Sequence, residues 1–468
     1  QAIDVEIQSV IKSCSMKNRP VLFLATLLCL LANLSWAADL EVDETDLIQR
    51  MGLLYKKFST ETFSGTVTKY YDSGQIKQKV QYAEGAEVNA FEQYFESGQI
   101  DFKGSLKAGQ RDGLWEFYYE NGQLINKTVY TDGQYQGLVE SYTEAGKLKD
   151  KGEYKNGKEH GIWKYYNENG DLDFQTTFSD GVKDGAWEHY HDDGQLWMIG
   201  RWKAGDRDGV WEYFHQNGQL KQSVNWVDGK QNGSEKSFYV NGQLDYKADW
   251  KDGLKVGLEE AYYDNEQIKL KATYQNGQKT GPEEAYHKNG KLALNGSWIS
   301  GKKDRLWEEF YKNGQLKASV VWEDQIKNGI ESLFYESAQL QYKVTWANGH
   351  KDGTEEAYYS NGQPKILGNW LKKSENGPWA EYMENGQLAM TGVYKAGQKQ
   401  GHWKNYYENA QLKSNTVYEE NKKHGLYLAY YENGKLSMKG NYADDARHGR
   451  WEFHNENGMF GRVENFEN

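Results

Sequence analysis

Proline and cysteine are scarce in this chain, and each scarcity excludes a class of protein. The 468 residues include 4 prolines and 2 cysteines, Cys14 and Cys29. Little proline and many aromatic residues indicate a folded, turn-rich β protein and not a disordered linker, and the cysteine count argues against a small disulfide-stapled protein. With a mean hydropathy of −0.93 the chain is too polar for a thick aliphatic core. Its 35 tyrosines and 17 tryptophans can supply the buried area instead.

Signatures of catalysis are missing as well. The sequence has no Walker motif, no Gly-x-Gly-x-x-Gly that opens a helix and no Gly-x-Ser-x-Gly. We therefore expect no enzyme, no catalytic residue and no cofactor. The formal charge of −12 argues against nucleic-acid binding, which requires clustered Lys and Arg.

One histidine-rich stretch, residues 189–193, resembles a metal site in composition only. Two histidines and two aspartates occur in His189-Tyr190-His191-Asp192-Asp193. The alternative is that His191, like His215 and His287, replaces a tyrosine of a repeated pattern. We favour that alternative and expect no metal. The Asp-Gly pairs, such as Asp112-Gly113, are expected to be turns and not calcium loops.

The N-terminal region has the order of an export signal. Basic residues near Met16 precede an apolar run from Val21 to Leu31, and Ser35-Trp36-Ala37 is a small-x-small cleavage site. We expect residues 1–15 to be an upstream segment outside the mature protein and residues 16–37 to be a signal peptide. The mature chain then has no transmembrane segment and is periplasmic, at the cell surface or secreted. An N-terminal membrane anchor is the alternative.

The rest of the chain is an internal repeat. The phrase Trp115-Glu116-Phe117-Tyr118-Tyr119-Glu120-Asn121-Gly122 returns near Trp163 and Trp211, and its glycine recurs at multiples of 24 residues from Gly74 to Gly458. Three slots hold Glu266, Ala338 and Ala410 instead, which gives 17 repeats without an insertion. Such a strict period indicates a repeat array over residues 61–460.

Each repeat is expected to contain two short strands. Counting from the central glycine as position 0, position −4 is aromatic in 16 of 17 repeats and position +2 is Leu or Ile in 15. Further glycines at +11 and +15 bound the strands. The sequence predicts an all-β fold, an elongated antiparallel β-meander array of 17 repeats with two strands each.

The hairpin register follows from the glycine. A three-residue loop, Glu120-Asn121-Gly122 in one repeat, with its glycine at positive φ, pairs −4 with +2. We expect −4, +2 and +8 to share the core face, with −7 and −3 on the other face.

The terminal repeats of such an array require capping segments. Leu47, Met51, Leu54, Tyr55 and Phe58 have helical spacing, so residues 38–60 are predicted to be a linker and a short capping helix. A membrane-surface helix is the alternative. Residues 461–468 are treated as a C-terminal tail.

These phrases, Trp-Glu-x-Tyr-Tyr-x-Asn-Gly-Gln-Leu followed by Tyr-x-x-Gly-Lys-x-Asp-Gly, resemble the variant MORN repeat. They are similar to bacterial antitoxin-labelled proteins of the YwqK kind. The resemblance covers about 400 residues. It implies a scaffold for protein interaction or an envelope protein, without catalytic residues, and a periplasmic immunity role is compatible with the export signal.

Aromatic residues at −7 and −3 are the candidate binding residues. They would form a ladder on one face that grips a protein, with a polysaccharide as the alternative ligand and mutual packing as the structural alternative. We therefore predict a non-enzymatic exported scaffold that binds another envelope or secreted protein. The ladder residues are Trp115, Tyr119, Trp163, Trp187, Trp211, Trp307, Tyr311, Trp379, Trp403, Tyr407 and Trp451.

Overall fold

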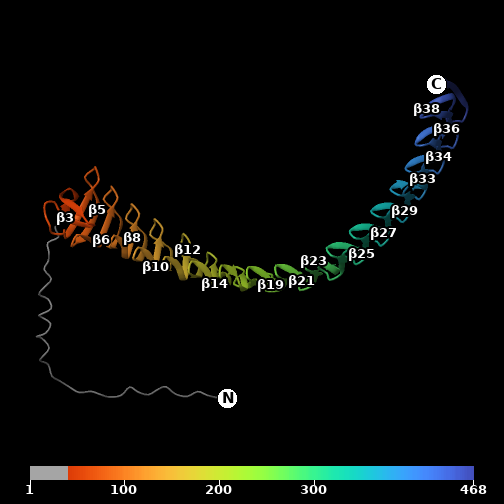
Figure 1. Ribbon diagram of the computed structural model, residues 1–468. Coiled ribbons are helices and arrows are strands. Elements are labelled where there is room, and N and C mark those ends of the chain that lie inside the picture. Colours follow the sequence, from red (N-terminus) through yellow and green to blue (C-terminus); the bar gives the residue numbers. More distant parts are fainter. Residues whose placement is uncertain (1–40, 468) are drawn as a thin grey trace, which may run out of the picture. The chain divides into compact units, whose positions relative to one another are not determined.

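The computed structural model describes residues 41–467, which are drawn in colour in Figure 1. The segments expected to be an upstream extension (1–15) and a signal peptide (16–37), and the first part of the expected linker, lie outside the described residues. The described chain divides into two compact units, whose boundary runs through β11 (Leu148–Lys155). Each unit is an antiparallel meander, so the all-β repeat architecture is confirmed in both.

The N-terminal unit comprises residues up to 148 together with 154–157. From β4 to β10 each strand pairs antiparallel with the next, and β1 pairs in parallel with β4 at the edge. Its elements are β1 (Glu41–Asp43), the 3-10 helix η1 (Glu44–Asp46), β2 (Leu47–Arg50), β3 (Leu53–Lys56), β4 (Gly65–Tyr70), β5 (Ile76–Ala83), β6 (Ala86–Tyr94), β7 (Ile100–Lys107), β8 (Gln110–Tyr118), β9 (Leu124–Thr131) and β10 (Gln134–Tyr142).

The C-terminal unit comprises residues 149–153 and 158–468. Two of its strands are each interrupted by one residue, which yields the short pieces β16 and β31. Its strands are β12 (Lys158–Tyr166), β13 (Leu172–Ser179), β14 (Val182–Tyr190), β15 (Leu196–Lys203), β16 (Asp206–Arg207), β17 (Gly209–Phe214), β18 (Leu220–Val227), β19 (Lys230–Phe238), β20 (Leu244–Lys251), β21 (Leu254–Tyr262), β22 (Ile268–Gln275), β23 (Gln278–Tyr286), β24 (Leu292–Ile299), β25 (Lys302–Phe310), β26 (Leu316–Glu323), β27 (Ile326–Phe334), β28 (Leu340–Ala347), β29 (His350–Tyr358), β30 (Pro364–Leu371), β31 (Ser374–Glu375), β32 (Gly377–Tyr382), β33 (Leu388–Lys395), β34 (Gln398–Tyr406), β35 (Leu412–Glu419), β36 (Lys422–Tyr430), β37 (Leu436–Ala443), β38 (Ala446–His454) and β39 (Phe460–Phe466).

The predicted capping helix is wrong. Residues 47–56 form the hairpin β2–β3, joined by a two-residue turn in which Met51 has φ 52° and Gly52 has φ 82°. A glycine in the middle of a short helix is unfavourable, whereas this turn requires positive φ at both positions. The hairpin still covers the start of the array, because Leu47 packs with Phe63 and Val67 in a small core.

The predicted C-terminal tail is also a strand. Residues 460–466 form β39, which pairs antiparallel with β38 in the register of the other repeats. The array therefore extends through the positions that the sequence analysis left outside it.

The three-residue hairpin loop is confirmed. In the repeat of Gly122 the N–H of Gly122 donates to the carbonyl of Tyr119 at 2.9 Å, and the N–H of Tyr119 donates to that of Gln123 at 2.8 Å. Gly122 has φ 82°, and Tyr118 pairs with Leu124. Position −4 thus faces +2, as predicted. The opposite end of each hairpin pair is a two-residue turn, such as Asp132-Gly133, with positive φ at both residues.

The predicted division of columns between the two faces is wrong, and a bulge is the reason. Between Phe117 and Tyr118 the register shifts, because Phe117 pairs with Asn126 while Tyr118 pairs with Leu124. The extra residue reverses the direction of the side chains beyond it. Position +8 therefore shares a face with −7 and −5, while −4 lies on the opposite face.

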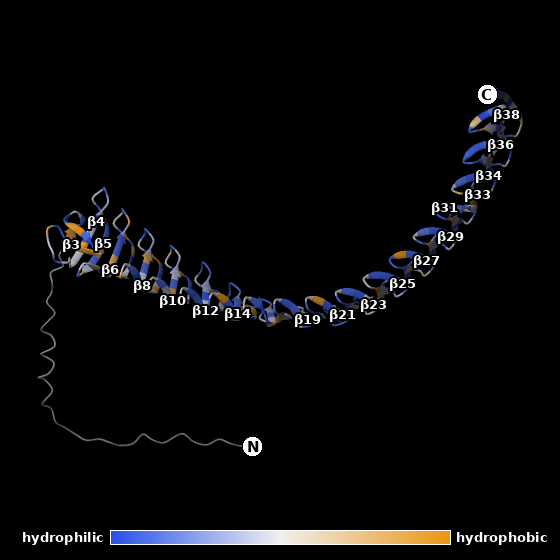
Figure 2. Cartoon of the chain, viewed as in Figure 1, coloured by the Kyte–Doolittle hydropathy of each residue, from blue (hydrophilic) through white to orange (hydrophobic). Residues whose placement is uncertain are grey.

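We name the two faces by their most frequent residues. The tryptophan face carries positions −11, −7, −5, +4, +6 and +8, which the ladders of β12, β13 and β14 pair with one another. The glutamate face carries −8, −6, −4, +5 and +7. Figure 2 shows hydrophilic colours over most strands, consistent with a thin core in which tryptophans predominate, with valine and alanine between them.

The three slots without the central glycine keep its conformation. Glu266, Ala338 and Ala410 have φ of 67°, 70° and 66°. An L-residue is strained there, so Ala410→Gly is expected to stabilise its hairpin by about 1 kcal/mol. Hydrogen exchange of the amides in β34 and β35 measures this local stability.

Gly170→Ala is the matched control. Gly170 has φ 92° and nothing lies within 4 Å of an added Cβ, so this substitution adds backbone strain alone. It should destabilise its hairpin by a similar amount. Unchanged exchange in both variants would contradict the strain at these turns.

Candidate functional site

The tryptophans at −7 are buried and do not form a surface ladder. Trp211 and Trp451 are 0% exposed, and Trp187, the most accessible of the set, is half-buried. All eight lie on the tryptophan face. The tyrosines at −3 lie elsewhere, in the hairpin turns. The predicted ladder is therefore not a continuous binding surface. Its buried tryptophans are Trp115, Trp163, Trp211, Trp307, Trp379, Trp403 and Trp451.

The tyrosines at −3 connect successive repeats. Tyr311 donates its hydroxyl hydrogen to the carbonyl of Phe334 at 2.8 Å, and Tyr407 to that of Tyr430 at 2.9 Å. Tyr119 makes the same bond to Tyr142 at 3.2 Å. Each acceptor belongs to the next repeat, so these predicted site residues hold the array together.

Two histidines and the turn asparagines take part in the same connection. His215 and His287 contact the carbonyls of Phe238 and Phe310 through Nε2, at 3.0 and 2.9 Å, which confirms that they replace tyrosine. At −1, Asn313 donates to the carbonyl of Glu336 at 3.0 Å. In the part of the chain from 41 to 467 no group of three or more His, Cys, Asp or Glu side chains could hold a metal ion.

Each buried tryptophan lies flat on a glycine of the preceding repeat. A Cβ on Gly392 would lie 2.2 Å from Cδ2 of Trp403, and one on Gly440 equally close to Trp451. Only glycine leaves room for the ring. Seven of the eight tryptophans have this partner at +6: Gly104, Gly152, Gly200, Gly296, Gly368, Gly392 and Gly440.

Where +6 is not glycine, −7 is usually glutamate. Ala272 precedes Glu283 and Val344 precedes Glu355, and the same holds for Glu235, Glu259 and Glu331. A methyl or isopropyl group fills the space of the indole, and the smaller glutamate fits beside it. This pairing of +6 with −7 is the signal in the sequence that our face assignment missed.

A lysine or arginine at −11 contacts the residue at −7, whether that residue is tryptophan or glutamate. Lys303 lies 4.2 Å from the ring centre of Trp307, and Arg207 lies 4.4 Å from that of Trp211. A cation over an indole ring is attracted by its π electrons. We call the repeats that have glutamate at −7 the glutamate repeats. In them the lysine at −11 forms an ion pair with that glutamate, as in Lys279 with Glu283 at 2.8 Å and Lys351 with Glu355 at 2.6 Å.

The buried glutamates at −7 accept several hydrogen bonds. Glu355 accepts hydrogen bonds from Tyr342, Lys351 and Trp370, and it is 6% exposed. Burial alone would raise the pKa of Glu355, but these three donors hold that pKa below its ordinary value. The pKa of Glu259 is lowered in the same way, with Lys255 and Tyr246 as donors.

The glutamate face presents a different set of side chains. At −4, Tyr118 donates to Glu116 at 2.9 Å, and Tyr142 donates to Glu140 at 2.8 Å. Lys127 at +5 pairs with Glu140 at 2.6 Å. Burial and the neighbouring glutamate, Glu188, raise the pKa of Tyr190 to about 12, so this hydroxyl stays protonated and donates at neutral pH.

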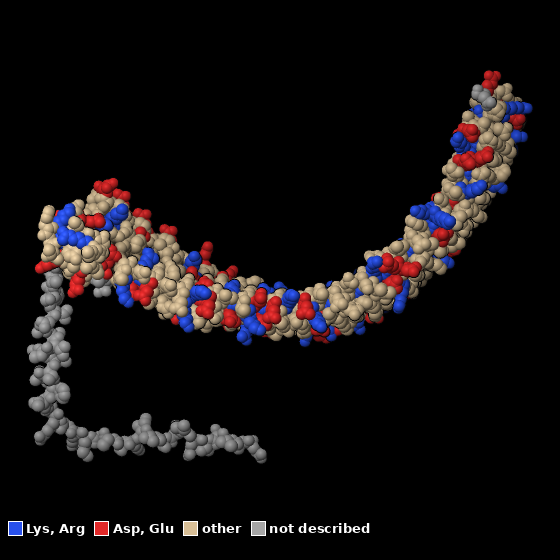
Figure 3. Space-filling view, in the orientation of Figure 1, with Lys and Arg blue, Asp and Glu red and all other residues tan. Residues whose placement is uncertain are grey.

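Aliphatic residues stand exposed on the same face at −8. In the C-terminal unit Ile162 is 59% exposed, Val210 53% and Leu258 48%. The N-terminal unit adds Leu138 at 71%. We call four residues at −8 in the C-terminal unit, Ile162, Val210, Leu258 and Leu306 (46% exposed), the aliphatic column. Figure 3 shows that acidic and basic side chains are interspersed over the visible surface of each unit, without a basic stripe.

The repeats match a known family of repeats. Ten segments match the model described as "MORN repeat variant": 63–84, 111–132, 135–156, 159–180, 183–204, 207–228, 255–276, 306–324, 351–372 and 423–444. These segments, which make up a little under half of the chain, are similar to the variant MORN repeat. A full matched segment runs from the −11 position to the two-residue turn, so the variant repeat includes the cation, the −7 residue and the residue at +6.

Other comparisons add little. No curated protein matches the chain. Among solved structures, "Crystal Structure of TcdB2-TccC3-TEV" is 10% identical over 86% of this chain and 28% of its own, with a TM-score of 0.16. "Crystal Structure of TcdB2-TccC3" is 11% identical over 84% of this chain and 27% of its own, with a TM-score of 0.15. This chain thus spans little more than a quarter of these structures. Within residues 41–467 no helix has the length and apolar character to cross a membrane.

The pairing of +6 with −7 can be tested by exchange. Gly296→Ala alone should cost about 1–3 kcal/mol through overpacking against Trp307. Trp307→Glu alone should cost about 3–5 kcal/mol through loss of the buried ring. The double variant copies Ala272 with Glu283, and Lys303 and Trp322 already occupy the positions of Lys279 and Trp298. The double variant should cost at least about 1 kcal/mol less than the sum of the costs of the two single variants.

Urea unfolding followed by hydrogen exchange in β24 and β25 measures these costs. Gly296→Ala combined with the remote Trp451→Glu is the control, and its two costs should add. Additivity in the Gly296 and Trp307 pair would contradict the pairing rule.

The glutamate repeats should also respond to acid. Because the folded pKa of Glu355 lies below its unfolded value, its contribution to stability is present above about pH 4.3 and is lost as the pH falls through the folded pKa. Local opening of β28 and β29 should therefore become easier on acidification, as measured by hydrogen exchange corrected for intrinsic rates.

Glu355→Gln tests whether this carboxylate causes the pH dependence of local opening. This variant should open more readily at neutral pH, because Lys351 loses its partner, and its opening should depend less on pH. The region of Trp403 and Gly392 has no buried carboxylate at −7 and is the internal reference. An equal acid response there would rule out Glu355 as the cause.

Proposed function

We propose that this MORN-variant repeat chain is a non-enzymatic exported scaffold whose glutamate face binds another protein of the bacterial cell envelope. The observation that carries the proposal is the aliphatic column. Singly scattered exposed aliphatic residues are ordinary, but recurrence at one position of a repeat places them along one face. The large side chains of the tryptophan face are buried against other residues of the chain, whereas the residues of the aliphatic column are roughly half exposed to solvent.

Hollows beside the aliphatic column support contact with a partner's side chains. One cavity of about 170 Å³ lies over β19, β20 and β21, next to Ser234 and Leu258. Another of about 250 Å³ lies near Thr354 and Pro378. Small residues stand at −8 in these places, so each hollow replaces an aliphatic side chain and has room for a side chain of the partner.

The glutamate face is locally acidic at a few repeats, although lysines at −6 and +5 match the glutamates at −6 in number over the whole array. Glutamate occurs at −6 in 10 of 17 repeats, and Glu212 and Glu308 have no lysine at the facing +5 positions. A partner with aliphatic and cationic side chains would complement these repeats by burial of apolar area and by charge.

Polysaccharide binding and a periplasmic immunity role are the two alternatives. Polysaccharide binding through stacked aromatics loses its main argument, because the tryptophans are buried. A periplasmic immunity role of the YwqK kind remains a special case of protein binding, in which the partner is a toxin.

A pull-down from native envelope extract tests the proposal. The tagged chain should retain one protein at near-equal stoichiometry, identified by mass spectrometry. Leu258→Glu and Leu306→Glu place a charge on the aliphatic column and should each reduce retention several-fold, since about 1 kcal/mol corresponds to a factor of five.

Val240→Glu is the matched control. Val240 is 62% exposed but lies in a hairpin turn, so retention should be unchanged. Equal loss in all three variants, or none in any, would contradict binding through the glutamate face. Retention of the bait by cell-wall polysaccharide alone would favour the glycan alternative.

A further inference from the structure

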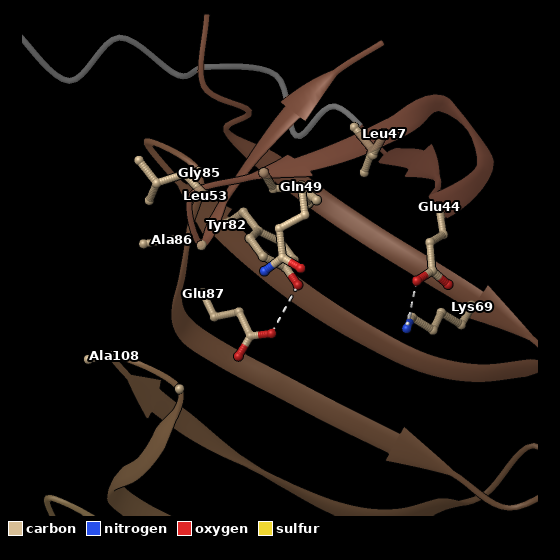
Figure 4. A pocket seen from close by; sticks show the side chains of 13 residues that line it. Glu44, Leu47, Gln49, Leu53, Lys69, Tyr82, Gly85, Ala86, Glu87 and Ala108 are labelled. Atoms are coloured by element: carbon tan, nitrogen blue, oxygen red, sulfur yellow. Dashed lines mark hydrogen bonds and ion pairs between the residues drawn. The ribbon is translucent and has the colours of Figure 1, made fainter.

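A second candidate site lies within the N-terminal unit, at the capping hairpin. A cavity of about 680 Å³ opens where hairpin β2–β3 meets the turn between β5 and β6 and the turn between β7 and β8. This volume is in the range of pockets that bind small molecules, so it is large enough to admit a long side chain with its neighbouring backbone. Figure 4 shows Gln49, Tyr82 and Glu87 grouped near its centre, with Leu53 and Gly85 to one side.

The charges around the cavity leave one carboxylate uncompensated. Glu44 and Lys69 form an ion pair at 2.9 Å. Glu87 accepts the hydroxyl hydrogen of Tyr82 at 3.0 Å, a neutral donor. Burial first, and then the charge of Glu87, raises the pKa of Tyr82, so that donor stays protonated. The lining therefore has a net charge of −1 from Glu44, Lys69 and Glu87.

The repeat pattern indicates which group this carboxylate would receive. Glu87 occupies position −11, which is Lys or Arg in 11 of 17 repeats. In those repeats the cation also approaches the aromatic residue at the preceding +8, as Lys255 does with Trp250 at 5.5 Å and Arg207 with Trp202 at 6.0 Å. At the cap the aromatic residue is kept as Tyr82, but the cation is replaced by an acid that faces a cavity.

We propose that this cavity binds the cationic side chain of a lysine or arginine from a polypeptide ligand. Glu87 is the counter-ion. Leu53 and Leu54 line the cavity beside it and accommodate the aliphatic stem of the side chain, a common arrangement for long basic residues. Gln49 offers an additional amide to the ligand. The site is separate from the glutamate face and does not depend on it.

Binding of blocked single amino acids to the full chain tests this site. The probes are N-acetyl-arginine amide and its uncharged isostere N-acetyl-citrulline amide, followed by saturation-transfer NMR. The arginine probe should bind, and the citrulline probe should bind at least tenfold more weakly, because a charged hydrogen bond contributes about 1.5–3 kcal/mol.

Glu87→Gln should weaken binding of the arginine probe about tenfold. Glu96→Gln removes the same charge from an exposed turn outside the cavity and should leave binding unchanged. Hydrogen exchange of β5 and β6 verifies that both variants keep the fold.

Three results would overturn the proposal. They are equal binding of both probes, unchanged arginine binding in Glu87→Gln, or no binding of arginine at millimolar concentration. None of these outcomes bears on retention of a partner by the glutamate face, because Leu258 and Leu306 lie outside this cavity.

Discussion

The contact between an indole ring and a glycine Cα governs the rest of this structure. A single antiparallel layer leaves both faces accessible unless large side chains lie down on one of them. Trp403 can lie flat only because Gly392 has no Cβ, and its ring then fills the space between neighbouring strands. The cation at −11 covers the ring in turn, as Lys399 does at 4.4 Å. The array thus obtains a buried layer without a second sheet.

The two faces acquire different roles from this arrangement. On the tryptophan face, most residues at −7 have a matched partner at +6, either glycine under an indole or alanine or valine beside a glutamate. On the glutamate face, Glu116 and Tyr118 bond to each other and to lysine, but Leu114 remains 51% exposed. One face is therefore buried by contacts within the chain, while the other keeps exposed aliphatic side chains.

Local features of this fold could be predicted from the sequence, and those that depend on distant strands could not. The loop at Gly122 was predicted correctly, because a glycine after Glu120-Asn121 determines the turn by itself. The face of Trp115 was not, because it depends on a bulge one strand away. Leu47, Leu54 and Phe58 fit a helix by spacing alone, yet Gly52 within that stretch already favoured a turn. The pairing of Gly104 with Trp115 was visible as a correlation between repeats, although neither residue alone indicates it.

The side-chain bonds from the hairpin turns to the neighbouring repeat have one direction. Tyr311 and Asn313 donate, and the carbonyls that accept, Phe334 and Glu336, belong to the following repeat. Most repeats present such donors to the next repeat and accept from the previous one. Removing or duplicating one whole repeat therefore rejoins matching surfaces, whereas a change of any other length misplaces donors and acceptors throughout the junction. A change of length that keeps every junction between repeats intact is therefore a multiple of 24 residues.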